Sequence, residues 1–371
     1  MSSSRRQFLH TSAAVVGASL LGSAHTSNLR TSSSRSSEPL NILILGGTGF
    51  VGPHQVEQAL ASGHRVTTFN RGRRQGFFGD RVEELIGDRD TKVGEGLAAL
   101  AGDRRWDVVI DNSGYVPRHV RDSAELLAER TDLYVFTSTV AAYDYEAAPQ
   151  VDGVHVVGAD GPLHAAPDPA TERVTGSSYG PLKAEADRIV LEVYGDRAAI
   201  VRPCYIVGPG DNSDRFTYWV ERLYRGGDVV CPAGPDKVMQ WIDVRDLCAF
   251  FLTVCESKTG GVFNAVGPAS TITNQQALWA LRGFAAAPTR LHWPTTELLE
   301  KTRFATPMFD WKRRNQRTDP SSGIEAGLTH RSLAETVRDT HLWWSEQSEE
   351  RRARTRGWPT ADQEAQLLEQ M

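Results

Sequence analysis

The sequence is poor in cysteine, has no long apolar run and carries no surplus of positive charge, and each shortage excludes a class of protein. Its four cysteines lie apart in the later half, with no CxxC pair, so neither a zinc site nor a disulfide scaffold is predicted and no metal ligands are assigned. The apolar stretch near the start, Ala13 to Leu21, is too short for a membrane span. A net charge of −5 disfavours nucleic acid as the main partner, because binding a phosphate backbone needs a basic surface.

What is present is the composition of a globular protein. The 371 residues are 40% hydrophobic and 23% charged, with a mildly acidic balance. That length can bury one large core or two interlocked ones, which excludes an isolated small module. A small molecule is therefore the expected kind of partner.

A first segment, residues 1–38, is predicted to lie outside the fold. Arg5-Arg6, the apolar run that follows and the small residues up to Ala24 resemble a twin-arginine export signal with cleavage after Ala24. Residues 27–37 are rich in Ser and Arg, which is typical of a flexible linker. The resemblance implies export to the periplasm or beyond, with no membrane span left after signal removal. A disordered basic tail on a cytoplasmic protein is the alternative.

The strongest local pattern is a glycine-rich turn between a strand and a helix. The short apolar run Leu40–Leu45 leads directly into Gly46–Gly52, and a helical pattern follows to Gly63. This context is what a dinucleotide-binding motif requires. Gly46 permits the tight turn, Gly49 lets the backbone approach a pyrophosphate, and Gly52 lets the helix pack closely on the sheet. The pyrophosphate would rest on amide groups at the start of the helix. The turn residues assigned to the cofactor are Gly46, Thr48, Gly49, Phe50, Val51 and Gly52.

The end of the second predicted strand, residues 65–69, bears on the choice of dinucleotide. An NAD-specific site usually has an acid at this point, and this chain has Asn70 followed by Arg71, Arg73 and Arg74. Without the carboxylate nothing repels a 2′-phosphate, and a guanidinium can hold that phosphate through two hydrogen bonds. The pattern favours NADP over NAD, with Asn70 and Arg71 in the cofactor site. A solvated arginine turn in an NAD protein is the alternative.

A tyrosine and a lysine four residues apart, Tyr179 and Lys183, open a predicted helix downstream of a strand that ends in Ser138 and Thr139. Residues i and i+4 share a helical face, so the ammonium is expected beside the phenol, where positive charge lowers the tyrosine pKa. Tyr179 can then act as general base toward a substrate hydroxyl, or as general acid in the reverse direction. The glycine turn, the Ser/Thr at the strand end and the YxxxK motif, in this order, resemble the extended short-chain dehydrogenase/reductase family, in its NAD-dependent epimerase/dehydratase group.

The resemblance implies further site residues. Thr139 would hydrogen-bond the reacting oxygen, with Ser138 as the alternative, and Lys183 would also bind the nicotinamide ribose. Asp88, after a third strand at residues 82–86, would contact the adenine, although an Asp after Gly is also ordinary turn chemistry. The role of Asp111, at the end of a fourth strand, stays open. The remaining residues assigned to the cofactor are Asp88, Arg89, Ser113, Gly114, Lys183 and Pro203.

The expected fold is α/β. A Rossmann-type, doubly wound parallel sheet over residues 39–205 is followed by a smaller α/β substrate lobe over residues 206–371, partly interleaved with the first domain. In this lobe Asp243 and Asp246 have capping-box spacing. Five large side chains are candidates for either the core or the substrate cleft, with the core favoured. They are Phe216, Tyr218, Trp219, Arg222 and Trp241. Residues after Trp344 carry no recognisable pattern.

The function implied is that of an NAD(P)-dependent oxidoreductase of the epimerase/dehydratase type. It would act on a sugar-like or other hydroxyl or carbonyl substrate by hydride transfer assisted by Tyr179 and Lys183, as a homodimer. No cluster of Arg or Lys in the sequence announces a pyrophosphate site for a nucleotide sugar, which points to a free sugar or another alcohol. A simple NADP-dependent dehydrogenase or reductase is the first alternative. A non-catalytic relative that binds NAD(P) or nucleic acid is the second.

Overall fold

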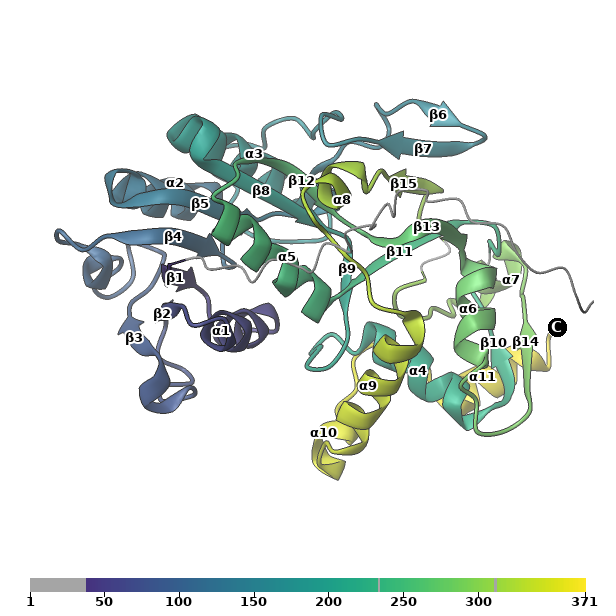
Figure 1. Cartoon of the computed structure of the whole chain (residues 1–371). Coiled ribbons are helices and arrows are strands. Elements are labelled where there is room, and N and C mark those ends of the chain that lie inside the picture. The colour runs from purple at the N-terminus through teal and green to yellow at the C-terminus, as the bar shows by residue number, and fades with distance from the viewer. Residues whose placement is uncertain (1–37, 233, 310–311) are drawn as a thin grey trace, which may run out of the picture. The chain divides into compact units, whose positions relative to one another are not determined.

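The computed structural model describes residues 38–232, 234–309 and 312–371. Seven parallel strands form its central sheet, in the order β12-β8-β5-β4-β1-β2-β3 (Figure 1). The chain runs outward from β1 to β3, then crosses back to β4 beside β1, so the strand order reverses between β1 and β4. This is the doubly wound arrangement, and it confirms the predicted Rossmann-type sheet. The strands are β1 Asn41–Leu45, β2 Arg65–Asn70, β3 Glu83–Ile86, β4 Trp106–Asp111, β5 Thr131–Thr137, β8 Ala198–Pro203 and β12 Gly261–Ala265.

Helices cover both faces of this sheet. On one face α1 (Val51–Ala61) and α5 (Val244–Ser257) pack over side chains such as Ile42 and Ile44, and on the other α2 (Pro117–Leu127) and α3 (Tyr179–Tyr194) cover Leu43 and Leu45. Because successive side chains of a strand point to opposite faces, a strand buried on both sides must be apolar throughout. The continuous apolar run before the glycine turn has this cause.

The chain after residue 206 returns to the sheet before it completes the second lobe. α5 lies against α1 in the core beneath the sheet, and β12 pairs in parallel with β8 as an edge strand. The two halves of the sequence therefore share one sheet.

The second lobe is built from three small sheets and the later helices. β13-β11-β9 form one sheet, β10-β14 another and β15-β7-β6 the third. Phe216, Tyr218, Trp219 and Trp241 are all buried in the apolar core of this lobe, and Arg222 bonds Glu364 at 2.7 Å. These five residues therefore pack the core, and none lines the large cavity described below.

The strands of the second lobe are β6 Gln150–Val151, β7 Val154–Val157, β9 Tyr205–Val207, β10 Gly227–Val230, β11 Val238–Asp243, β13 Gly267–Thr273, β14 Thr289–His292 and β15 Gln316–Thr318. The helices are α4 Arg215–Arg225, α6 Asn274–Arg282, α7 Thr296–Thr302, α8 Ser321–Glu325, α9 Leu333–Ser345, α10 Glu349–Ala353 and α11 Ala361–Leu368. Five short 3₁₀ helices, Gly79–Arg81, Ala98–Leu100, Ala128–Arg130, Val140–Ala142 and Gly195–Arg197, complete the elements.

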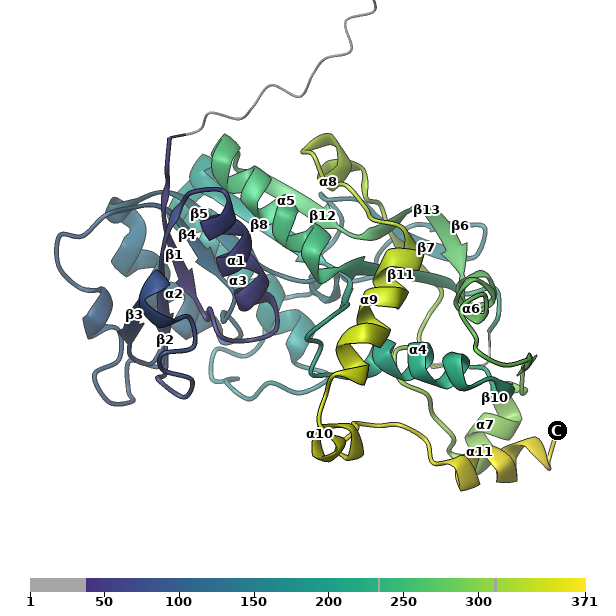
Figure 2. The same cartoon turned by 60° about the horizontal axis from the view of Figure 1, so that its bottom comes forward.

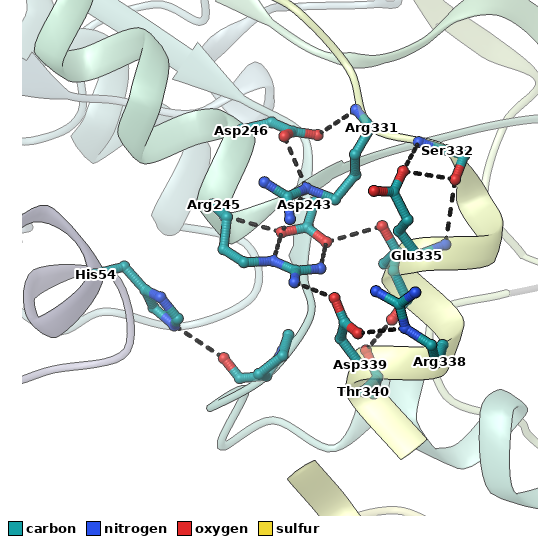
Figure 3. Close-up of polar contacts among 12 residues, drawn as sticks. His54, Asp243, Arg245, Asp246, Arg331, Ser332, Glu335, Arg338, Asp339 and Thr340 are labelled. Carbon is teal, nitrogen blue, oxygen red and sulfur yellow. Dashed lines mark hydrogen bonds and ion pairs between the residues drawn. The ribbon is translucent and has the colours of Figure 1, made fainter. Parts of the chain in front are cut away.

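A network of acids and arginines, in which Asp243 and Asp246 are buried, ties α9 to the start of α5 (Figure 3). Asp243 caps α5 by accepting from the backbone N–H of Arg245 at 2.9 Å, and its other oxygen accepts from the Thr336 hydroxyl of α9 at 2.8 Å. Asp246 accepts two bonds of 2.8 Å from Arg331. The capping prediction is therefore right for Asp243 and wrong for Asp246, whose carboxylate binds Arg331 in the segment before α9 instead.

The predicted export signal falls in residues 1–37, outside the described residues. Across the part of the chain that the structure covers, no helix combines the length and the apolar character that a membrane crossing needs.

Candidate active site

One large cavity, of about 900 Å³, opens along the carboxyl ends of the central strands and continues into the second lobe. Ligands of open α/β sheets bind at this edge, where the strand order reverses. Nearly all the residues predicted for the site line this cavity. They are Gly46, Thr48, Gly49, Phe50, Val51, Gly52, Asn70, Arg71, Asp88, Arg89, Ser113, Ser138, Thr139, Tyr179, Lys183 and Pro203. Gly114 lies behind the wall, where a Cβ would meet the Phe136 ring at 2.3 Å.

The glycine turn has the geometry that the motif predicts, with one difference. Gly46 has a φ of +91°, a conformation that favours glycine. An added Cβ on Gly49 would meet no atom within 4 Å, whereas one on Gly52 would lie 2.3 Å from the carbonyl oxygen of Gly47. The close packing that requires Gly52 is therefore against the turn itself rather than against the sheet. Gly49 leaves the mouth of the turn open toward the cavity.

The end of β2 presents arginines to the cavity and no carboxylate. Arg71, Arg73 and Arg74 all line it. Arg74 donates from Nη1 to the carbonyl oxygen of Thr48 at 2.8 Å and stacks 4.0 Å from the Phe77 ring centroid, so it joins the β2 end to the glycine turn. Asn70 accepts a long, 3.4 Å bond from the Thr48 hydroxyl. Thr48 and Asn70 thus connect the two segments that would enclose the adenosine end of a dinucleotide.

Asp111, whose role the sequence left open, is the buried counter-charge of Arg89. The two side chains form an ion pair, and Asp111 also accepts from the Tyr134 hydroxyl at 2.8 Å and from the Ser113 backbone N–H at 3.0 Å. Burial lowers the pKa of Arg89, but Asp111 and Tyr134 together outweigh this lowering and the net pKa is raised. Asp111 therefore fixes Arg89 and Ser113 at the cavity floor. Asp88 lines the cavity and also accepts from the Asp90 N–H at 2.9 Å, which is the turn chemistry foreseen for it.

Tyr179 and Lys183 begin α3 and both face the cavity, but their electrostatics differ from the expectation. Burial raises the pKa of Tyr179, which outweighs a lowering by the Thr139 hydroxyl and a further one by the charge of Arg215. The Lys183 ammonium donates at 2.7 Å to each of two carbonyl oxygens, of Gly114 and Thr137. The predicted lowering of the Tyr179 pKa by Lys183 is therefore not found: the phenol is kept protonated, and the ammonium is anchored to the wall.

The structure separates the roles of Ser138 and Thr139. The Thr139 hydroxyl interacts with that of Tyr179, whereas the Ser138 hydroxyl lies against the buried carboxylate of Asp187 and lowers its pKa. Asp187 accepts from Nε of Arg202 at 2.9 Å. Burial lowers the pKa of Lys183 to about 8, and Asp187 is the first of the charges that oppose this lowering. Of the two candidates, Thr139 is the one whose hydroxyl affects the pKa of the Tyr179 phenol.

Sequence reasoning missed the far end of the cavity. Tyr205, Arg215, Gln240, Arg313, Gln316 and Thr318 line it there. Among the described lining residues Asp88 is the single carboxylate, beside six arginines and Lys183. Arg215 and Arg313 are far apart in the sequence, which explains why no basic cluster was visible. The lining fits a ligand with several negative charges.

These residues fit a bound dinucleotide. The open Gly49, the backbone N–H groups at the start of α1 and the arginines after β2 suit a pyrophosphate and an adenosine phosphate. Tyr179, Thr139 and Lys183 line the same cavity and would surround the reactive end. No group of three or more His, Cys, Asp or Glu suited to a metal ion occurs among the described residues.

Comparisons with known proteins agree with this picture. The model of the NAD dependent epimerase/dehydratase family matches residues 42–265. The chain is 27% identical over 242 residues to the chloroplast stem-loop binding protein of 41 kDa b of Arabidopsis thaliana, covering 61% of this chain and 58% of that protein. It therefore spans less than two thirds of that relative. It is 25% identical over 258 residues to the epimerase family protein SDR39U1 of Bos taurus, covering 65% of this chain and 79% of that one.

Solved structures are similar over most of the chain. WbmG of Bordetella bronchiseptica, in complex with NAD, has a TM-score of 0.61 at 16% identity, covering 84% of this chain and 96% of that one. The dTDP-glucose 4,6-dehydratase of Bacillus anthracis, also in complex with NAD, has a TM-score of 0.59 at 16% identity, covering 84% and 98%. At such identities the likeness shows the fold.

Proposed function

The chain belongs to the NAD dependent epimerase/dehydratase family, and on that premise we propose that it is an NAD(P)-dependent oxidoreductase of the epimerase/dehydratase type. The observation that carries the proposal is the meeting of Tyr179, Thr139 and Lys183 on one wall of the cavity whose other end is the glycine turn. The residues of the glycine turn and the arginines after β2 would hold a dinucleotide, and Tyr179, Thr139 and Lys183 would surround its reactive end. The chemistry that such a cofactor supplies is hydride transfer to and from a substrate carbon.

The residues of the chain would handle the proton and hold the reacting oxygen. Tyr179 would take the hydroxyl proton as the substrate carbon loses its hydride, and would give it back when the carbonyl is reduced. Thr139, whose hydroxyl interacts with that of Tyr179, would donate to or accept from the reacting oxygen. The raised pKa of Tyr179 means that the phenol starts protonated, so the oxidative direction should speed up with rising pH until Lys183, whose pKa is lowered to about 8, loses its proton.

The substrate end of the cavity bears on the substrate class. Arg215 and Arg313 line it together with the neutral hydrogen-bonding side chains of Gln240, Gln316 and Thr318. This combination suits a sugar that carries a phosphate or carboxylate better than the free sugar inferred from the sequence. MoeE5 is a structural neighbour whose solved complexes contain UDP-glucuronic acid or UDP-glucose together with NAD. We take sugar nucleotides as the first substrates to test.

The test has two parts. Mass spectrometry of the native protein for retained nicotinamide dinucleotide separates an internal redox cycle, which keeps its cofactor, from a dehydrogenase that exchanges it. Incubation with UDP-glucose, UDP-glucuronic acid and dTDP-glucose, followed by NMR of the products, then identifies the reaction. Tyr179→Phe should abolish turnover and retain dinucleotide binding, while the exposed Tyr224→Phe should behave as wild type. Full turnover by Tyr179→Phe would contradict the proposal.

We also propose that NADP is the preferred cofactor, since the β2 end offers arginines and no acid. Arg71→Ala should weaken NADP binding about tenfold or more, as expected for loss of a charged phosphate contact, and should leave NAD binding nearly unchanged. The exposed Arg65→Ala, at the opposite end of β2, is the matched control. Calorimetric titration of each variant with both dinucleotides measures the difference. Equal losses for the two cofactors would show that Arg71 does not face a 2′-phosphate.

A second candidate function rests on the printed name of one relative, a stem-loop binding protein. The chain would then bind RNA and use the dinucleotide site without turnover. An electrophoretic mobility assay with a labelled RNA stem-loop, at several salt concentrations, tests this reading directly. Binding that is indifferent to Tyr179→Phe, together with no turnover of any sugar nucleotide, would favour it over the enzyme.

From residues 1–38 we propose export through the twin-arginine route. Cell fractionation of the full chain and of an Arg5→Lys/Arg6→Lys variant tests this. The wild type should reach the periplasm and the variant should stay in the cytoplasm.

A further inference from the structure

A loop between β9 and α4 sets the position of Arg215 in the cavity. Within it, Asp211 accepts from the Ser213 N–H and from the Ser213 hydroxyl, both at 2.8 Å. The Ser213 oxygen in turn accepts from Nε of Arg215 at 2.9 Å, and the Arg215 guanidinium stands 4.9 Å from the Tyr205 ring centroid. Arg215 is near enough to Tyr179 for its charge to lower the pKa of that phenol. The orientation of Arg215 therefore depends on the path of this loop.

The last residue of the loop, Asp214, is held from outside the cavity. It precedes α4, where an Asp usually accepts from a backbone N–H of the first helical turn. Here Asp214 has a φ of 57° and its side chain makes no capping bond. Its carboxylate, 1% exposed, instead accepts from both terminal nitrogens of Arg351 in α10, at 3.1 and 2.5 Å. The indole N–H of Trp358 donates to the Asp214 carbonyl at 3.0 Å. Asp214 therefore does not cap α4, and its carboxylate binds the C-terminal segment instead.

Arg351 is itself firmly placed. Its guanidinium lies 5.0 Å from the Trp344 ring centroid, and Trp358 packs against Trp344 and Tyr218, each at 5.5 Å between ring centroids. Trp344 belongs to α9, which contacts α4 and precedes α10 in the chain (Figure 2). The ion-pair network of Figure 3 fixes α9 to α5. Arg351 is thus held against an indole ring of α9, which itself packs on α4.

The other end of the loop is tied to the cofactor side. Nε2 of His54 in α1 lies 3.0 Å from the Pro209 carbonyl oxygen (Figure 3). A Cβ on Gly210 would meet Phe50 at 3.5 Å, and Phe50 follows the glycine turn directly. With both ends held, the loop has little freedom to move Arg215 by itself. If the contact of Asp214 with Arg351 were lost, only the contact of His54 with the other end of the loop would help to position Arg215.

We propose that Arg351 is a positioning residue that fixes Arg215 in the cavity through Asp214, so that the C-terminal segment determines how tightly the enzyme holds an anionic substrate. The inference rests on the proposed function only for the identity of the bound group. The mechanical link from Arg351 to Arg215 stands apart from it. The consequence for catalysis is specific: Arg351 acts on substrate binding first, and it reaches the chemical step at Tyr179 only through the charge of Arg215 beside the phenol.

The experiment uses the full chain and four variants. Arg351→Gln removes the ion pair, and Arg351→Lys keeps the charge but not the two-pronged geometry. Asp214→Asn breaks the pair with a residue that tolerates the left-handed backbone, which guards against a variant that fails to fold. Arg352→Gln is the matched control, since that side chain is the exposed neighbour in the same helix. Phenylglyoxal labelling of Arg215, located by mass spectrometry, reports its position, and kinetics with the sugar nucleotides named above report its role.

Arg351→Gln and Asp214→Asn should label faster at Arg215. Their KM should rise on the order of tenfold to a hundredfold, as for a small misplacement of a binding group. The change in kcat should be smaller than the change in KM, because Arg215 affects the phenol only through its charge, and dinucleotide affinity should change little. Arg351→Lys should recover part of the loss, and Arg352→Gln should match wild type. Unchanged labelling of Arg215 would overturn the positioning, and faster labelling with an unchanged KM would overturn the role in binding. If the wild type turns over none of the sugars, the proposed function fails, while the labelling still decides the link between Arg351 and Arg215.

Discussion

Two glycines of the same turn should respond in opposite ways to one added methyl group. At Gly52 the new Cβ would lie 2.3 Å from the backbone oxygen of Gly47, so the turn and α1 would have to separate. At Gly49 the new Cβ would meet no atom within 4 Å, so the protein itself can accept it. The space beside Gly49 is the space in which we expect the pyrophosphate. Gly52→Ala should therefore damage the fold, and Gly49→Ala should damage cofactor binding.

The sizes follow from these contacts. Overpacking against a rigid backbone typically costs about 1–3 kcal/mol, and the better helix propensity of Ala returns about 1 kcal/mol at most. Because the added Cβ of Gly52 meets backbone, the upper end of that cost applies, and a net loss of about 2 kcal/mol in the free energy of unfolding is expected for Gly52→Ala. Gly49→Ala should leave that free energy within about 0.5 kcal/mol of wild type, as for an open site. Its affinity for NAD and NADP should fall at least tenfold, or about 1.4 kcal/mol.

Urea unfolding and calorimetric titration with each dinucleotide measure the two effects separately. Gly176→Ala is the control, because Gly176 is exposed, lies outside the cavity and has nothing within 4 Å of its added Cβ. Wild-type affinity in Gly49→Ala would refute the placement of the pyrophosphate at this turn. Wild-type stability in Gly52→Ala would refute the packing argument.

Two further predictions concern buried charges. Asp187 opposes the burial that lowers the pKa of Lys183 to about 8, so Asp187→Asn should lower that pKa further and move the alkaline limb of the kcat/KM profile to lower pH. The exposed Tyr224→Phe should leave the limb in place, and an unmoved limb in Asp187→Asn would contradict the coupling. Asp111→Asn should cost about 3–5 kcal/mol of unfolding free energy because it leaves Arg89 buried without its counter-charge. The double variant Arg89→Met/Asp111→Leu should recover most of that stability, as measured by urea unfolding. A loss under about 1 kcal/mol in the single variant would refute the role of Asp111 as a buried counter-charge.

The parts of the fold that the sequence predicted are those coded by short-range patterns. The run Asn41–Leu45 had to be apolar throughout because its alternate side chains enter two different cores, and Gly46 had to be glycine because of its positive φ. Tyr179 and Lys183 face one cavity because four residues make about one helical turn. Such patterns stay within one element, or within one element and its adjoining turn.

The electrostatics of the site could not be predicted in this way. Whether Lys183 lowers the Tyr179 pKa depends on what else the ammonium touches, and its partners, the carbonyl groups of Gly114 and Thr137, lie 69 and 46 positions away. The balance between burial and charge at Tyr179 likewise depends on Arg215 from the second lobe. A pKa is a sum over all neighbours in space, so a motif can supply the groups without giving the sign of their shift.

The C-terminal segment shows the same limit more sharply. Beyond Trp344 no pattern in the sequence indicated a role, yet Arg351 and Asp214, 137 positions apart, form a bidentate pair with the carboxylate fully enclosed. Exposed ion pairs contribute little to the stability of the fold, whereas breaking a buried ion pair leaves a buried charge without its partner. The contribution of Arg351 to stability therefore depends on the burial of Asp214, which arises only in the folded chain. Because Arg215 follows Asp214 directly and lines the cavity, loss of the ion pair is expected to displace a side chain of the cavity. On this proposal, a segment in which the sequence shows no motif takes part in substrate recognition.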